Sequence, residues 1–402
     1  MRAGRLSGAL GLLVAAAAGA CGAQEVSSRW VVSSDPGLVE LATDLLPDLA
    51  MRSGLELREP VRIERRSRED LVRYLHIKLD EEMPPEDARA TVDAYALLGL
   101  VPADLDLRSV LLSLYTEQVA GYYEPDSTAL FVMDDQPEGA LEALLVHELV
   151  HALQDQSADL DALTDRGLGN DRAVAAQTAI EGHATLVMLE YMTEQMLGEP
   201  IDIAEIPDFA AQMRPALEAM RGQFPALAGA PTIIQESLLF PYLEGTAYVQ
   251  SLWAGGDRIA PFGTRLPFST EQVLTRGSAE EPIDLELTAL AGRIVREDVL
   301  GRLEVGILLQ EHGAAAAAAD GWAGDRYALV ESATGARSLA WYALWDDAAA
   351  RDRFLDAMRG ALAGMGATAT IEPLEVQGRA GTLLRVGEPP RVDARIRVAE
   401  GP

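Results

Sequence analysis

The chain is organised around one stretch, Val146-His147-Glu148-Leu149-Val150-His151, which has the pattern His-Glu-x-x-His. Residues four apart on a helix lie on one face, so His147 and His151 can hold the same cation. Neutral imidazole is a good zinc ligand, and zinc with an open position for water lowers the pKa of that water towards neutrality. Glu148 lies beside both histidines, where it can accept the proton. The stretch therefore predicts a helical metal site with Glu148 as general base.

The residues around this pattern favour a metal site over a chance match. Between Leu141 and Leu153 most positions are apolar, which is typical of a helix buried on all sides. Polar side chains in such a helix need partners, because burying them unpaired costs free energy. Two histidines and a glutamate together are accounted for most simply by a bound metal.

A third protein ligand is expected from a second helix, predicted at residues 173–197 from its apolar periodicity. The candidates on it are Glu181 and His183. Residues two apart point to roughly opposite sides of a helix, so only one of the two can reach the metal. The loop predicted at residues 157–170, rich in Asp and Gly, would join two antiparallel helices.

These motifs resemble the gluzincin branch of the zinc metallopeptidases, whose second helix often carries glutamate followed by Gly-x-Ala, as residues 181–184 do (Glu-Gly-His-Ala). The resemblance covers residues 116–191 best and looks like an uncharacterised bacterial branch of zincin-like lipoproteins. It implies that Glu181 is the third ligand of one Zn²⁺ per chain and that His183 is an outer or surface histidine. It also implies hydrolysis of peptide bonds in a peptide or protein substrate.

Two departures from the family pattern bear on activity. No Gly-x-Met-Glu-Asn stretch precedes His147, as it does in gluzincin aminopeptidases that hold a free amino terminus, so an endopeptidase is favoured. Thr185 stands where thermolysin-like enzymes carry an aspartate that orients a histidine ligand. The hydrogen bonds that orient the metal ligands are then expected from Thr185 or from another residue, such as Asp155.

A zinc hydrolase also needs a donor for the oxyanion that develops at the attacked carbonyl. Gluzincins often take a Tyr or His from beyond the glutamate helix. By order in the chain, Tyr248 is the predicted catalytic donor, with Tyr242 and His312 as alternatives. For either tyrosine taken singly, packing in the core is the more common role of such a residue.

Composition limits the partners. The chain has 402 residues, enough for two or three packed units, and a hydrophobic content of 49% that can build a large core. Its 33 Lys and Arg against 63 Asp and Glu give a formal net charge of −30. Such a charge repels phosphate backbones, so nucleic acid is not expected as a partner.

The N-terminus has the features of an export signal. Arg2 and Arg5 precede a short apolar run over residues 9–20, followed by Cys21, the one cysteine in the sequence. Small residues before a cysteine resemble a bacterial lipobox, although Ala18 stands where leucine is usual. This predicts an exported protein anchored to the cell-envelope membrane, on its periplasmic or outer face, through a lipid on Cys21. An ordinary signal peptide cleaved after an alanine is the alternative.

The predicted fold class is α+β, with a mostly helical, zincin-like core and a small C-terminal α+β module. A hairpin at residues 120–133 leads into the metal helix, and in zincin folds such a strand edges the cleft. The alternative to a zinc endopeptidase is an inactive zincin-scaffold lipoprotein that serves as a binding module. The predicted regions are a signal peptide at 1–20, a lipidated tether at 21–36, an N-terminal helical and α+β region at 37–119, a catalytic region at 120–305 and the C-terminal module at 306–402.

Overall fold

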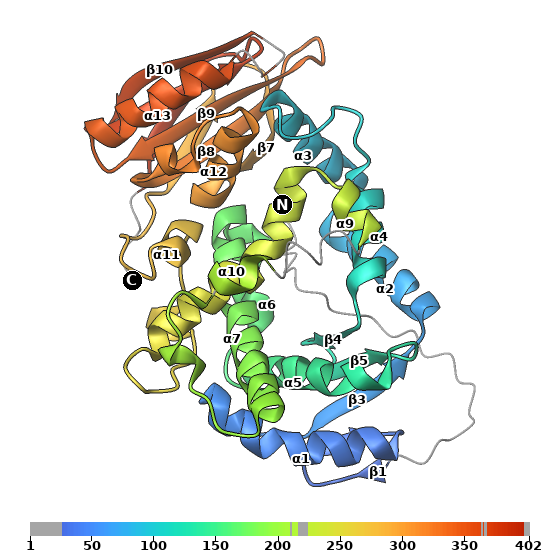
Figure 1. The fold of residues 1–402 in the computed structure, drawn as a ribbon. Coiled ribbons are helices and arrows are strands. Elements are labelled where there is room, and N and C mark those ends of the chain that lie inside the picture. Colours follow the sequence, from blue (N-terminus) through green and yellow to red (C-terminus); the bar gives the residue numbers. More distant parts are fainter. Residues whose placement is uncertain (1–25, 210, 216–223, 363–364, 366–367, 398–402) are drawn as a thin grey trace.

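The computed structural model describes residues 26–209, 211–215, 224–362, 365 and 368–397. Within these residues the chain is an α+β protein, as predicted (Figure 1). The predicted signal peptide at 1–20 and the predicted lipid attachment at Cys21 lie outside the described residues.

A five-stranded mixed sheet lies beneath the central helices (Figure 1). Its spatial order is β1-β2-β3-β5-β4, with β2, β3 and β5 parallel and β4 antiparallel at one edge. The hairpin predicted at residues 120–133 is therefore confirmed, and β4 is an edge strand. The strands are β1 (Val26–Ser27), β2 (Val31–Ser33), β3 (Val61–Arg66), β4 (Gly121–Glu124) and β5 (Ala129–Met133).

Strand β5 is apolar throughout because both of its faces are covered. Leu130 and Val132 pack into the cluster that contains α1 and α5, whereas Phe131 packs with Tyr74 and Leu71 of α2 on the other face. A strand buried on both faces loses the usual alternation of polar and apolar residues. The helices of the N-terminal part of the chain are α1 (Pro36–Ser53), α2 (Arg68–Glu82), α3 (Pro85–Leu97) and α4 (Leu107–Gln118), and α3 packs against the C-terminal sheet.

The predicted tether at 21–36 is wrong for its described part. Residues 26–33 form β1 and β2, and β2 pairs in parallel with β3. Val31 is fully buried against α1, so this segment belongs to the core. The predicted boundary at residue 120 also fails, because β3 and β5 lie side by side in one sheet.

The central helices carry the predicted metal-site residues. Helix α7, predicted at 173–197, begins three residues earlier and packs most extensively against α10. This group comprises α5 (Glu138–Asp155), α6 (Leu160–Leu163), η1 (Arg166–Leu168), α7 (Asn170–Leu197), η2 (Ile203–Glu205), α9 (Pro225–Gly229), α10 (Thr232–Trp253), η3 (Gly263–Arg265) and α11 (Thr270–Leu274).

The C-terminal module is a second, antiparallel sheet of order β10-β11-β9-β8-β7, with α12 and α13 on one face and the pair β12-β6 on the other. Because β6 and β7 belong to it, the boundary predicted at residue 306 is too late. The module consists of β6 (Leu285–Ala289), β7 (Arg293–Asp298), α12 (Gly301–Glu311), η4 (Ala316–Ala319), β8 (Trp322–Glu331), β9 (Arg337–Trp345), α13 (Ala348–Ala361), β10 (Ala369–Val376), β11 (Arg379–Val386) and β12 (Val392–Ile396).

The module is joined to the start of α7 by half-buried polar contacts. Asp298 accepts the backbone N–H of Asn170, and Glu304 accepts the Asn170 side-chain amide. Since the first N–H groups of a helix have no partner within it, the module supplies a cap for α7. The C-terminal module and the helix that carries Glu181 are therefore structurally coupled.

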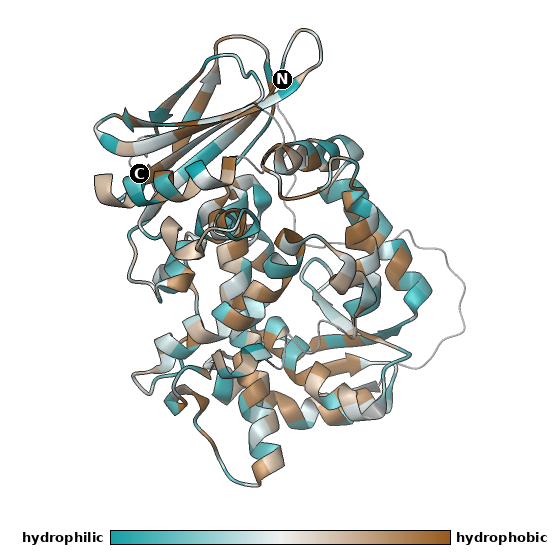
Figure 2. Ribbon diagram, turned by 45° about the horizontal axis from the view of Figure 1, so that its top comes forward, coloured by the Kyte–Doolittle hydropathy of each residue, from teal (hydrophilic) through white to brown (hydrophobic). Residues whose placement is uncertain are grey.

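Polar and apolar residues are mixed along the helices, as Figure 2 shows. Within the described part of the chain, no helix is both long enough and apolar enough to span a membrane.

Candidate metal centre

Helix α5 places the two histidines of the pattern side by side. Leu145, Val146, Leu149 and Val150 are fully buried, so this part of the helix is held in the core, as predicted. The imidazole rings of the histidines meet edge to face, with their Nε2 atoms 3.1 Å apart. The buried apolar neighbours thus hold two nitrogens that could bind a metal at one point.

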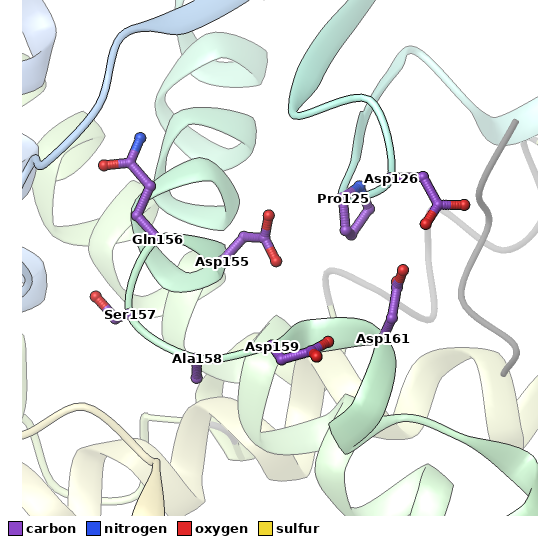
Figure 3. A pocket seen from close by; sticks show the side chains of 8 residues that line it. All are labelled: Pro125, Asp126, Asp155, Gln156, Ser157, Ala158, Asp159 and Asp161. Carbon is purple, nitrogen blue, oxygen red and sulfur yellow. The ribbon is translucent and has the colours of Figure 1, made fainter. Parts of the chain in front are cut away.

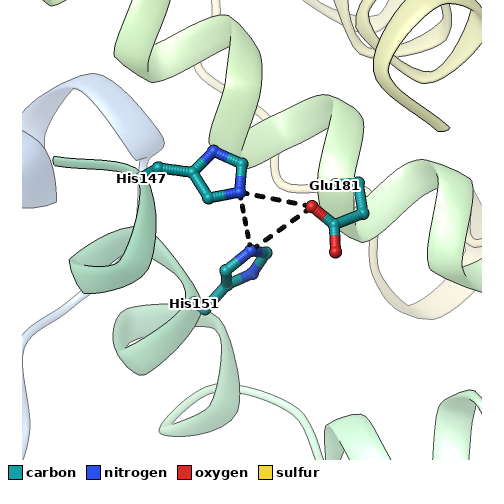
Figure 4. A group of neighbouring side chains, drawn as sticks. All are labelled: His147, His151 and Glu181. Carbon is teal, nitrogen blue, oxygen red and sulfur yellow. Dashed lines mark hydrogen bonds and ion pairs between the residues drawn. The ribbon is translucent and has the colours of Figure 1, made fainter. Parts of the chain in front are cut away.

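Helix α7 brings Glu181 to the same point (Figure 4). Its Oε2 lies 3.2 Å from Nε2 of His147 and 3.5 Å from Nε2 of His151. Its other oxygen accepts a hydrogen bond of 2.7 Å from the amide of Gln177, one turn earlier on α7. One carboxylate oxygen is therefore fixed by the protein while the other faces the histidines.

The charges at this point favour a cation. Burial acts to raise the pKa of Glu181, but His151 and His147 outweigh it and hold that pKa well below its usual range. Burial acts to lower the pKa of His151, but Glu181 and Glu148 outweigh it and raise that pKa. The carboxylate that favours the charged form of His151 would also stabilise a bound cation.

The spacing of the three ligand atoms fits zinc. An ion held tetrahedrally at about 2.0–2.1 Å separates its ligand atoms by about 3.4 Å, and the three separations here are 3.1, 3.2 and 3.5 Å. Among the described residues, His147, His151 and Glu181 are the one group of this kind that could hold an ion. Imidazole and carboxylate ligands also suit other divalent transition metals.

Glu148 faces the edge strand. It is only 7% exposed, and burial raises the pKa of its carboxyl, with the neighbouring histidines and the backbone N–H of Tyr123 acting in the opposite direction. Tyr123 belongs to β4, so the predicted general base lies between the metal ligands and the edge strand. A carboxylate with a raised pKa is a better proton acceptor than an ordinary exposed one.

Tyr242, and not Tyr248, joins this group. The ring of Tyr242 lies 6.4 Å from that of His147, and the charge of Glu181 together with burial raises the pKa of its hydroxyl well above the usual value. The residue remains 39% exposed, so it is at the open side of the site.

The prediction that Tyr248 is the catalytic donor is wrong in its placement. Its hydroxyl is buried and donates to the backbone carbonyl of Arg265 at 2.6 Å. Residues six apart on α10 lie on different faces of the helix, so Tyr242 and Tyr248 cannot both face α7. His312, the other alternative, donates to the carbonyl of Leu98 at the end of α3.

Two glycines explain why Tyr242 reaches Glu181. A Cβ on Gly182 would lie 2.0 Å from the carbonyl carbon of Gly245, and one on Gly245 would lie 2.1 Å from the carbonyl oxygen of Thr178. Only glycine at both positions lets the backbones of α7 and α10 approach this closely. The Gly in the Glu-Gly-His sequence thus has a packing role at the crossing.

Neither side chain that was predicted to support the ligands is hydrogen-bonded to one of them. Asp155 accepts the hydroxyl of Tyr123, and Oγ1 of Thr185 has no hydrogen-bond partner among the described residues. His183 is fully buried, and it contacts Gln154. Gln154 in turn lies 2.8 Å from Nδ1 of His151. Sequence reasoning missed Gln154, although it is three residues after His151, on the same face of the helix.

A separate acidic pocket lies at the C-terminal end of α5 (Figure 3). It is open, has a volume of about 520 Å³ and contains none of the three candidate ligands. Burial and the nearby Asp126 raise the pKa of Asp161 within it. The residues lining it are Pro125, Asp126, Asp155, Gln156, Ser157, Ala158, Asp159 and Asp161.

Comparison with known proteins gives one partial match. A family described as "Domain of unknown function (DUF8575)" matches residues 288–400, which contain β7 to β12 and thus most of the C-terminal module. No curated protein and no solved structure matches the chain significantly. The candidate metal centre lies outside the matched range.

Proposed function

We propose that this chain is a zinc-dependent endopeptidase. The observation that carries the proposal is the convergence of two imidazole Nε2 atoms and one carboxylate oxygen within 3.5 Å of one another. Each residue comes from the position that the gluzincin pattern assigns to a ligand. His147, His151 and Glu181 would hold one Zn²⁺, and a bound zinc supplies an acidified water and polarises a carbonyl.

The chain's own residues then have distinct roles. Glu148, buried beside the ligands, would accept the proton of the attacking water and pass it to the leaving amine. The hydroxyl of Tyr242 would donate a hydrogen bond to the oxyanion. A tyrosine hydroxyl has an ordinary pKa of about 10, so it is protonated at neutral pH, as a donor must be, and Glu181 raises the pKa of Tyr242 further.

The edge strand offers a place for the substrate. Strand β4 pairs with β5 on one side only, and its other side has no strand partner among the described residues. An extended peptide would add to this edge through main-chain hydrogen bonds. Because Tyr123 of β4 faces Glu148, such a peptide would run past the proposed general base. Main-chain pairing favours an endopeptidase acting on unfolded or extended segments.

Glu148→Gln tests the mechanism against the alternative of an inactive binding scaffold. The ligands remain in this variant while the proton acceptor is lost, so zinc content should be unchanged and hydrolysis of a generic unfolded protein should fall by more than about 10²-fold. A chelator should abolish wild-type hydrolysis, and zinc should restore it. Absence of hydrolysis in the zinc-loaded wild type would favour the binding scaffold instead.

We also propose that Cys21 carries a lipid that anchors the protein to the cell envelope. The short apolar run before this cysteine has the features of an export signal, and an acyl chain on Cys21 would bury hydrocarbon in the membrane. Cys21→Ser should move the protein from the membrane fraction to the soluble fraction of cells expressing it. Retention of the variant in membranes would contradict a lipid anchor.

A further inference from the structure

A chain of hydrogen bonds runs from His151 to the end of helix α1. Nδ1 of His151 lies 2.8 Å from Oε1 of Gln154, and Nε2 of Gln154 lies 3.0 Å from both the Ile180 carbonyl and Nδ1 of His183. Nε2 of His183 lies 3.0 Å from the carbonyl oxygen of Ser53. His151 is 8% exposed, and Gln154, His183 and Ser53 are fully buried, so water does not compete for these groups.

The carbonyls of Ser53 and Ile180 determine which atoms carry the protons in this series of hydrogen bonds. A carbonyl only accepts, so the Ser53 carbonyl requires a proton on Nε2 of His183, and the Ile180 carbonyl requires the nitrogen of the Gln154 amide. The same nitrogen therefore donates to Nδ1 of His183. The amide oxygen is left facing His151, whose Nδ1 must carry the proton.

This orientation leaves Nε2 of His151 with a free lone pair directed at His147 and Glu181. A histidine that ligates a metal through one nitrogen commonly donates its other N–H to a neighbouring acceptor, which fixes the ring and strengthens the ligand. In contrast, Nδ1 of His147 is buried without a hydrogen-bond partner among the described residues. Among the described residues, His151 has such a hydrogen-bonded acceptor at its Nδ1 atom and His147 does not.

We infer that Gln154 and His183 are positioning residues for the metal site: they hold His151 in its Nδ1–H tautomer with Nε2 aimed at the ion. The inference rests on the proposed function, because it assumes that His151 is a ligand. It also gives His183 a role two hydrogen bonds away from the proposed ligand His151 and links the site to the backbone of α1.

Zinc affinity of purified variants, measured by competition with a chelator, tests this role. Gln154→Leu removes the acceptor for His151 and should weaken zinc binding about 10–100-fold. His183→Phe should have a smaller effect, because the Ile180 carbonyl still orients the Gln154 amide. Gln154→Glu keeps the acceptor but loses the donor, so it should recover most of the affinity that Gln154→Leu loses.

The Glu variant separates positioning from packing. If Gln154 only satisfied the Ile180 carbonyl and His183, the Glu and Leu variants would lose affinity equally, and that result would overturn the inference. Gln156→Leu is a matched control, since Gln156 lies on the same end of α5 and bonds the backbone of residues 58 and 59. His312→Phe is the control for loss of a histidine bonded to a carbonyl. Both should bind zinc as the wild type does.

A measurement on the wild type covers the case in which a variant does not fold. The chain has five histidines, few enough for their ring tautomers to be assigned by nitrogen-15 NMR of the zinc-loaded protein. The expected result is Nδ1–H for His151 and Nε2–H for His183, and the opposite tautomer at either ring would overturn the inference. If the wild type binds no zinc, the proposed function fails instead, and the tautomer of His183 still tests the hydrogen-bond chain in the metal-free protein.

Discussion

Helix α7 carries two carboxylates, Asp171 and Glu181, whose pKa values shift in opposite directions. Asp171, in its first turn, lies at the junction with the C-terminal module, where burial raises the pKa of its carboxyl to about 7. Glu181, farther along the same helix, is half-buried, and the histidines of α5 hold its pKa well below the usual range. The same helix thus carries two carboxylates in different electrostatic environments.

The difference lies in what faces each carboxylate. At the junction, Asp171 accepts from the backbone N–H and hydroxyl of Thr270, and Glu304 accepts from Tyr95 and Asn170. These donors are neutral and belong to the protein, so the acids can remain protonated in a closed polar cluster. At the candidate metal centre, one oxygen of Glu181 meets two imidazole nitrogens. A buried acid alone is therefore not a candidate metal site, whereas three ligand atoms that face one point are.

Removal of Glu181 should have the largest effect on metal content. Glu181→Ala takes away one of three ligands and should leave the purified protein with little or no zinc, as measured by native mass spectrometry. Asp171→Ala makes the same change on the same helix and should retain one zinc per chain. His183→Ala should also retain it, with a loss in affinity of about 10–100-fold at most. A metal-free His183→Ala protein beside a zinc-bound Glu181→Ala protein would reverse the assignment.

Substitution at the α7–α10 crossing should disturb the metal centre without removing a ligand. Gly182→Ala would place a Cβ 2.0 Å from the backbone of Gly245, so the helices must separate. We expect a loss of about 1–3 kcal/mol or more in the free energy of unfolding, together with weaker zinc binding. Gly139→Ala on α5 is the control, because nothing lies within 4 Å of its added Cβ. That change should raise stability by about 0.5–1 kcal/mol, and equal losses in both variants would contradict the crossing argument.

The junction between α7 and the C-terminal module should make the free energy of unfolding depend on pH. This effect should be smaller than those of the Glu181 and Gly182 substitutions. Burial, which Tyr95 and Asn170 partly offset by hydrogen bonding, raises the pKa of Glu304 to about 8 from the ordinary 4.5, so the folded state holds a proton that the unfolded state has lost. Its contribution to stability should therefore fall as pH rises from about 4.5 to about 8, by at most about 1.4 kcal/mol per pH unit.

Glu304→Gln isolates that contribution. The variant keeps a neutral acceptor for Tyr95 and Asn170, so Tm measured from pH 5 to 8 should fall less steeply than in the wild type. Glu304→Ala should instead be less stable at every pH, because it leaves both donors buried and unpaired. Parallel wild-type and Gln curves would show that Glu304 is ionised in the folded protein.

Local patterns in the sequence predicted much of the molecule. The metal helix, the hairpin before it and the glutamate helix all occur as expected, because their signals lie within single turns or between neighbouring strands. Residues 326–331 and 338–345 have the aromatic and aliphatic composition that is typical of strands, and they lie within β8 and β9. Strand β10 continues through Pro373, which the sheet accommodates because β10 lies at its edge.

The predictions that were wrong concern contacts between segments that are far apart in the sequence. Residues 26–33 look like a polar tether in isolation, but Val31 becomes buried once β2 pairs with β3. The boundaries at 120 and 306 failed because strands from both sides of each boundary share one sheet. Strand pairing depends on the partner as much as on the strand, so no local signal marks it.

The sequence by itself determined which residues could meet at a metal. The i, i+4 spacing places His147 and His151 on one face of a helix, and the i, i+2 spacing separates Glu181 from His183, because helix geometry is the same in every context. Only the tertiary structure decided that Tyr242 joins them, that Tyr248 does not, and that Gln154 and His183 support His151. Those choices depend on how closely α7 approaches α10 and on where α1 ends, and both are set by packing between segments far apart in the chain.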